Sequence, residues 1–107
     1  ILGSIEYGCA VAGAKLVVVV GHTRCGAVTA AVNLACSGQS AAEATGCEHL
    51  DQIVEEVQRS VDVPTCRAVA HLPPAGQEEL VNGVARRNVL RVVETLQEQS
   101  RMIASLV

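Results

Sequence analysis

The chain has 107 residues, of which 50% are hydrophobic and 18% are charged, and its formal net charge at pH 7 is −3. This length suits a single domain, and the acidic balance excludes a basic nucleic-acid-binding surface as a first hypothesis. The longest apolar run, Leu16 to Val20, is far shorter than the roughly 20 residues of a transmembrane helix, so no membrane span is expected.

The first third of the chain is expected to hold two helices around one strand. Residues 4–14 favour a helix, because Ser4 can cap its start and a carboxylate follows in its first turn. Residues 16–20 include four consecutive valines without polar alternation, which is typical of a strand buried on both faces of a parallel sheet. A short loop over residues 21–26 and a helix of small residues over 27–35 follow.

The rest of the chain is predicted to be mainly helical. A loop over residues 37–46 precedes an amphipathic helix over 48–61, and residues 65–72 suit either a short strand or a helical turn. Two prolines at 73 and 74 are expected to break the chain before a long helix over 77–97 and a last helix over 100–107. The sequence therefore predicts an α/β fold, dominated by helices, whose one clear strand needs neighbours from outside these residues or from another chain.

The cysteines are odd in number and evenly spread. Such spacing in an acidic, Val/Ala-rich domain predicts a reducing compartment with buried thiols or a metal site rather than a disulfide framework. No basic and apolar leader is present, so we expect a cytoplasmic protein. A chain that begins with Ile1 is expected to be a fragment, a processed product or the ordered part of a longer chain. The five cysteines are Cys9, Cys25, Cys36, Cys47 and Cys66.

The loop after the predicted strand carries the strongest chemical signal. His22 and Cys25 lie three residues apart, and imidazole and thiolate are usual zinc ligands. Cys25 also falls at a predicted helix start, where free amide groups favour a thiolate. A phosphate-binding P-loop is excluded, because Ala27 and Val28 replace its lysine and hydroxyl residues. Without further context, a buried cysteine beside a helix-capping histidine would fit the same pattern.

The wider pattern resembles the β-class carbonic anhydrases. The chain contains Ser-Ile-Glu-Tyr at residues 4–7, an apolar strand at 16–20, and Gly-His-Thr-Arg-Cys-Gly-Ala at 21–27, in the order and spacing of that family. The Asn-Val-Leu of residues 88–90 and the Met-Ile of 102–103 are also similar to the family's later helices. The middle of the chain, residues 37–77, resembles the family only loosely.

This resemblance implies a parallel-sheet fold and a zinc enzyme that hydrates carbon dioxide to bicarbonate. In the family, two cysteines and one histidine hold zinc, and His22 and Cys25 match two of these three ligands. The remaining cysteine belongs to a Cys-x-Asp-x-Arg segment, whose Asp–Arg pair frees a zinc position for water. That segment does not occur in this sequence, so no catalytic residue is identified and the chain alone is expected to bind zinc poorly and to be inactive. Carbonyl sulfide and carbon disulfide remain alternative substrates.

The resemblance also bears on partners and on alternative functions. Tyr7 matches a tyrosine that takes part in a second, inhibitory bicarbonate site in some members, although a packed interface tyrosine is the other interpretation. A homodimer or higher homo-oligomer is expected, because the family builds its sites at dimer interfaces. The alternative to the enzyme is a non-catalytic carbonic-anhydrase-like domain fused to a sulfate-permease-type anion transporter, with a role in regulation or partner binding.

Two further polar groups are interpreted as structural. Cys47 and His49 are two residues apart near a helix start and point to different faces, which disfavours a second metal site. Asn88 interrupts the apolar stripe of the long helix and is predicted to be a hydrogen-bonded core amide.

Overall fold

The structure is a computed structural model that describes residues 1–62, 64, 66 and 71–107. The chain divides into two compact units, one formed by residues 21–88 and the other by residues 1–20 together with 89–107. Most of the segment expected to be a short strand or helical turn, 65–72, lies outside the described residues.

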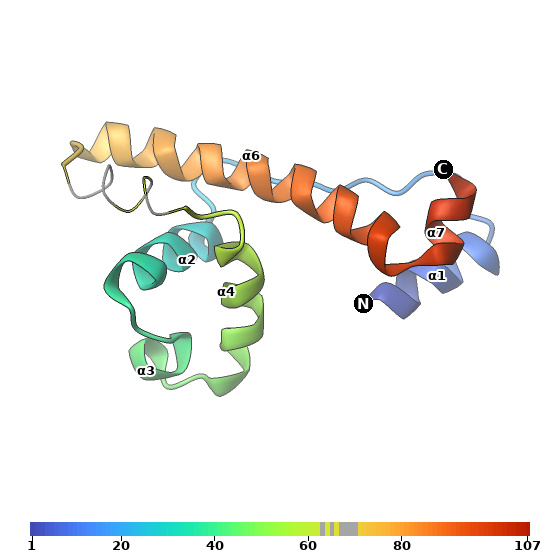
Figure 1. Cartoon of the computed structure of the whole chain (residues 1–107), viewed down its shortest axis with the longest axis horizontal. Helices are drawn as coiled ribbons and strands as arrows, with labels where there is room; N and C mark the ends of the chain where they lie inside the picture. The colour runs from blue at the N-terminus through green and yellow to red at the C-terminus, as the bar shows by residue number, and fades with distance from the viewer. Residues whose placement is uncertain (63, 65, 67–70) are drawn as a thin grey trace. The chain divides into compact units, whose positions relative to one another are not determined.

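Short helices and the first part of a long one build the unit of residues 21–88. Helix α2 packs against α4, and α3 and a short 3₁₀ turn, η1, lie between them in sequence (Figure 1). The elements are α2 (Gly26–Ser37), α3 (Ala41–Thr45), η1 (Glu48–Leu50), α4 (Asp51–Gln58) and α6 (Pro74–Gln99), of which α6 continues into the other unit.

The core of this unit is made of small aliphatic side chains. Val32 of α2 and Val84 of α6 are fully buried at 0% exposure, and they are the largest side chains buried to that degree. The composition explains why the core is aliphatic, because the chain has no Phe or Trp to bury. The buried cluster consists of Val28, Ala31, Val32, Leu34, Ala41, Val54, Val57, Val81, Val84 and Ala85.

Residues with special backbone preferences set the helix ends of this unit. Helix α2 ends at Gly38, whose φ of +76° is the left-handed conformation that glycine adopts without steric cost. The region expected to be a loop, 37–46, contains the five-residue helix α3. The Ser40 side chain caps α3 by accepting a 3.1 Å hydrogen bond from the backbone N–H of Glu43.

The two longer helices were expected from their apolar periodicity and are confirmed with shifted ends. The predicted helix 48–61 forms as η1 followed by α4, with Val54 and Val57 buried. Helix α6 starts at Pro74 rather than at residue 77, so the expected break falls at Pro73 and Pro74 is already part of the helix. The reason is that proline is well suited to the first turn of a helix, where its missing N–H would have no intrahelical partner.

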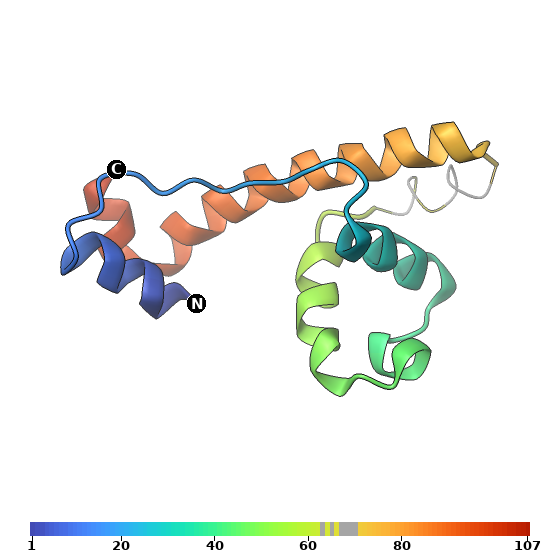
Figure 2. The same ribbon diagram turned by 180° about the vertical axis from the view of Figure 1, so that it is seen from behind.

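The other unit holds the two chain ends. Helix α1 (Leu2–Ala10) contacts α7 (Arg101–Leu106), as both ribbon views show (Figure 2). Ser100, at 3% exposure, caps α7 by accepting a 3.2 Å hydrogen bond from the backbone N–H of Ile103. Both terminal helices were expected, although α1 ends four residues earlier than residue 14.

The expected strand over residues 16–20 is wrong. No residue in the described ranges is in a strand, so the parallel sheet implied by the valine run is absent from them. The segment is instead irregular and open to solvent, with Leu16 78%, Val18 65% and Val20 78% exposed. A strand exists only through hydrogen bonds to a neighbour, and no described segment pairs with this one. Within its own unit, α4 packs on α2.

One pair of cysteines also differs from the expectation of free thiols. Cys36, near the end of α2, and Cys66 form a disulfide with their Cα atoms 5.2 Å apart, a separation that suits such a bridge. Cys9, Cys25 and Cys47 are free thiols.

None of the helices in the described ranges combines the length and apolarity needed to cross a bilayer.

Candidate functional site

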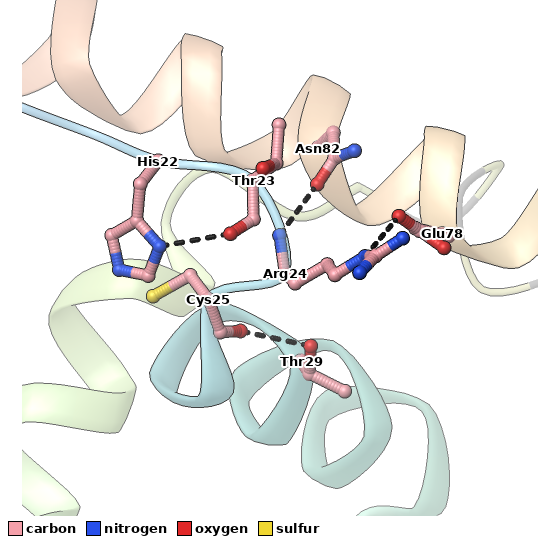
Figure 3. A network of polar contacts seen from close by, with 7 residues as sticks. All are labelled: His22, Thr23, Arg24, Cys25, Thr29, Glu78 and Asn82. Atoms are coloured by element: carbon pink, nitrogen blue, oxygen red, sulfur yellow. Dashed lines mark hydrogen bonds and ion pairs between the residues drawn. The ribbon is translucent and has the colours of Figure 1, made fainter.

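The loop over residues 21–25 presents His22 and Cys25 on either side of a two-residue turn. Thr23 and Arg24 form the turn, and Arg24 has a φ of +55°. Among the described residues it is the one non-glycine residue with positive φ. Figure 3 shows the imidazole of His22 and the thiol of Cys25 projecting from the same side of this loop.

A hydrogen bond determines which nitrogen of His22 is free to bind a metal. The Nδ1 atom lies 2.9 Å from the backbone oxygen of Thr23 (Figure 3). A carbonyl oxygen can only accept, so Nδ1 carries the proton and Nε2 keeps its lone pair. Metal-binding histidines commonly donate their second ring N–H to a carbonyl in this way. His22 is exposed, which leaves Nε2 accessible.

Cys25 is held at the start of α2. It is the N-cap residue of that helix, and its backbone oxygen accepts hydrogen bonds from the Thr29 N–H at 3.0 Å and the Thr29 hydroxyl at 2.8 Å. The side chain is half-buried and packs against the core cluster. Cys25 is therefore a free cysteine whose backbone is fixed at the start of α2, whereas His22 is exposed to solvent.

Two side chains of α6 hold Arg24. Its backbone N–H donates to Asn82 Oδ1 at 3.1 Å, and its Nε donates to Glu78 Oε1 at 2.8 Å (Figure 3). The hydrogen bond to Glu78, together with attraction between the two charges, raises the pKa of the Arg24 guanidinium. Because the Arg24 side chain is 80% exposed, this ion pair is strongly screened by water.

A cavity of about 270 Å³ lies next to the same contacts. Its lining includes Arg24, Glu78 and Asn82 but neither His22 nor Cys25.

The donor set agrees with zinc in kind but not in number. One imidazole nitrogen and one thiol are typical zinc donors, and a catalytic zinc site needs three protein ligands. Within the part of the chain that the structure describes, no group of three His, Cys, Asp or Glu residues is placed to hold a metal ion. His22 and Cys25 are therefore two donors of the kinds that zinc binds, and the described residues place no third donor with them.

The other candidates from the sequence belong to other elements. Tyr7 is 62% exposed on α1 and belongs to the unit of the chain ends, and its role in bicarbonate binding or at an interface stays a prediction. Cys47 and His49 are both exposed near η1. The Ser60 hydroxyl donates to Asn88 Oδ1 at 3.2 Å, so the predicted hydrogen bond is confirmed, although Asn88 is half-buried and does not belong to the core.

Glu78 and Asn82 were not identified from the sequence as parts of this region. Their spacing of four residues places them on one face of a helix, a signal that the sequence does contain. However, a polar pair at that spacing is also typical of any solvated helix face. The sequence gives no indication that this face of α6 meets the loop 54 residues or more earlier in the chain.

Comparison with known protein families agrees with the resemblance inferred from the sequence motifs. The carbonic anhydrase family model matches residues 1–107, which is the whole chain. No curated protein and no solved structure matches the chain significantly. Because the family match covers the entire length and includes the Gly-His-Thr-Arg-Cys-Gly-Ala loop, the chain belongs to the β-class carbonic anhydrase family.

Proposed function

We propose that this chain is the part of a β-class carbonic anhydrase that supplies two of the three zinc ligands for the reversible hydration of carbon dioxide to bicarbonate. His22 would bind through Nε2 and Cys25 through its thiolate. The observation that carries the proposal is the hydrogen bond from His22 Nδ1 to the Thr23 carbonyl, which leaves a metal-binding lone pair beside a free, helix-capping cysteine.

Each residue would have a separate task in this site. The Thr23 carbonyl orients the imidazole and fixes its tautomer, and the first turn of α2 anchors Cys25. Zinc, when bound, supplies Lewis-acid activation of water at neutral pH. The Cys-x-Asp-x-Arg segment of the family is missing from the sequence, so neither the third ligand nor the Asp–Arg pair is assigned to a residue here.

The incomplete donor set keeps a second function open. A carbonic-anhydrase-like domain that lacks the third ligand would serve as a regulatory or partner-binding domain, for example one attached to an anion transporter. The feature that favours this alternative is the absence of Cys-x-Asp-x-Arg from all 107 residues. Oligomerisation and a cytoplasmic location are part of the proposal in either case.

The test combines metal content with activity. We expect the 107-residue chain to bind zinc weakly and to show no carbon dioxide hydration, because two ligands hold zinc poorly. In a form of the protein that carries a Cys-x-Asp-x-Arg segment, we expect about one zinc per chain and hydration that Cys25→Ser abolishes. Cys47→Ser is the matched control and should leave both unchanged.

Two results would contradict the proposal. Tight, stoichiometric zinc in the 107-residue chain that survives both His22→Ala and Cys25→Ser would place the metal elsewhere. A form with the Cys-x-Asp-x-Arg segment that binds neither zinc nor substrate would favour the non-catalytic domain.

A further inference from the structure

The turn between the two proposed ligands has a backbone conformation that needs support. Arg24 has a φ of +55°, a region that L-residues other than Asn, Asp and His rarely adopt. Because Arg24 immediately precedes Cys25 and follows His22 by two residues, its φ determines how the chain turns between the two side chains. A change of Arg24 to an extended conformation would redirect Cys25 relative to His22.

Asn82 provides the support that acts on the backbone itself. Its Oδ1 accepts the Arg24 N–H at 3.1 Å, and Asn82 is half-buried on a long helix whose neighbouring residues Val81 and Val84 belong to the core. Glu78, four residues earlier on the same face, binds the Arg24 side chain at 2.8 Å. The Glu78 contact acts on the side chain of Arg24 and not on its backbone, and water screens it because the two side chains are 80% and 45% exposed.

We propose that Asn82, assisted by Glu78, is a positioning residue for the metal loop: it holds Arg24 in the left-handed conformation that projects His22 and Cys25 to the same side. This inference rests on the proposed metal role of those two residues. Figure 3 shows the arrangement, with α6 contacting Arg24 and the two ligand side chains on the other side of the loop. Among the hydrogen bonds of the described residues, Asn82 bonds to Arg24 and to neither ligand side chain, so it acts through Arg24.

The experiment measures metal binding in a chain with one free thiol. In a Cys9→Ser/Cys47→Ser background, Cys25 is the remaining free cysteine, because Cys36 and Cys66 are in the disulfide. Cadmium ion is the probe, since it is soft and gives an ultraviolet thiolate-to-metal absorption band that reports on sulfur binding. Hydrogen exchange of the Arg24 amide, followed by NMR, reports on the bond to Asn82 in the same samples.

We expect Asn82→Ala to weaken cadmium binding by about tenfold and to speed exchange of the Arg24 amide. Alanine is a better helix former than asparagine, so α6 should be retained, and far-ultraviolet circular dichroism checks this. Asn82→Asp keeps an oxygen at the same place and should restore most of the affinity and the slow exchange. The matched control is Asn33→Ala, which removes an exposed amide of α2 and should change neither readout.

A double variant separates positioning from general stability. In a His22→Ala background, Asn82→Ala should have little further effect on cadmium binding, because no second ligand is left to position. A purely structural role would weaken binding equally in both backgrounds. If Asn82→Ala does not fold, Asn82→Gln takes its place, because it moves the amide by one methylene. We again expect weaker cadmium binding and faster exchange of the Arg24 amide.

The outcomes distinguish this inference from the proposed function. If His22→Ala and Cys25→Ser leave cadmium binding unchanged, the metal pair itself is wrong, and the inference is overturned with it. If both weaken binding while Asn82→Ala speeds Arg24 exchange without changing the affinity, the metal pair stands and the positioning role of Asn82 is overturned.

Discussion

The Ser100 hydroxyl donates a hydrogen bond of 2.9 Å to Glu6 Oε2, joining residues that are 94 positions apart in sequence. The same hydroxyl accepts from the N–H of Ile103 and so caps α7 while it binds α1. One buried serine thus caps the start of α7 and ties the two ends of the chain together.

Ser100→Ala should destabilise the unit of the chain ends by about 1–2 kcal/mol, because it removes a helix cap and a buried hydrogen bond together. Urea denaturation followed through NMR signals of α1 and α7 measures the change in the free energy of unfolding. Ser105→Ala, an exposed change within α7, is the control and should stay within about 0.5 kcal/mol. Equal effects of the two changes would show that Ser100 has no special role.

Reduction of the Cys36–Cys66 disulfide should lower the free energy of unfolding by about 3 kcal/mol, because the bridge closes a loop with a sequence separation of 30 residues. Thermal denaturation with and without a reductant measures this loss, and the Cys36→Ala/Cys66→Ala variant should lose the response to reductant. Cys47→Ala serves as the control. Thiol counting on the unfolded, unreduced chain should give three free cysteines, and a count of five would contradict the bridge.

Val32→Ala should cost about 2 kcal/mol of stability, because the Val32 side chain is fully buried between the helices of its unit. The same substitution at Val18, which is 65% exposed, should change stability by less than about 0.5 kcal/mol. Both values come from chemical denaturation of the single variants. A large loss at Val18 would mean that this residue is buried in solution.

The exposed apolar side chains of residues 16–20 lead us to expect self-association, because contiguous apolar surface is rarely left open to water. Sedimentation velocity at micromolar concentrations should detect a dimer or a larger oligomer. Val18→Asp should shift the equilibrium towards the monomer, whereas Glu55→Asp, at an exposed position of α4, should not. A parent chain that sediments as a stable monomer would refute the expectation.

The helices could be predicted from the sequence because their determinants are local. Ser100 is a typical cap, and the apolar stripe with Val54 and Val57 reports directly on the face that is buried. The start of α6 was placed too late because proline disfavours helix interiors but is accepted in the first turn, and the sequence does not distinguish the two positions at Pro74.

The irregular structure of residues 16–20 and the contact of Asn82 with the loop could not be predicted, because both depend on tertiary contacts rather than on local sequence. A valine run indicates burial on both faces, but burial and a hydrogen-bond ladder both depend on a partner, and Val18 has none among the described residues. Likewise, the loop motif identified His22 and Cys25 by residue type and spacing. The contact of Asn82 with Arg24 depends on the tertiary packing of α6, which no local pattern records.

The position of Tyr7 has a practical consequence for spectroscopy. It is the single aromatic residue of a chain without Phe or Trp, and it lies exposed on α1. Intrinsic fluorescence therefore reports on the unit of the chain ends and is silent about residues 21–88. A tryptophan introduced at the exposed position of Asn33 and excited at wavelengths that tyrosine does not absorb would be the single emitter, so its fluorescence could follow events around α2 and the loop before it.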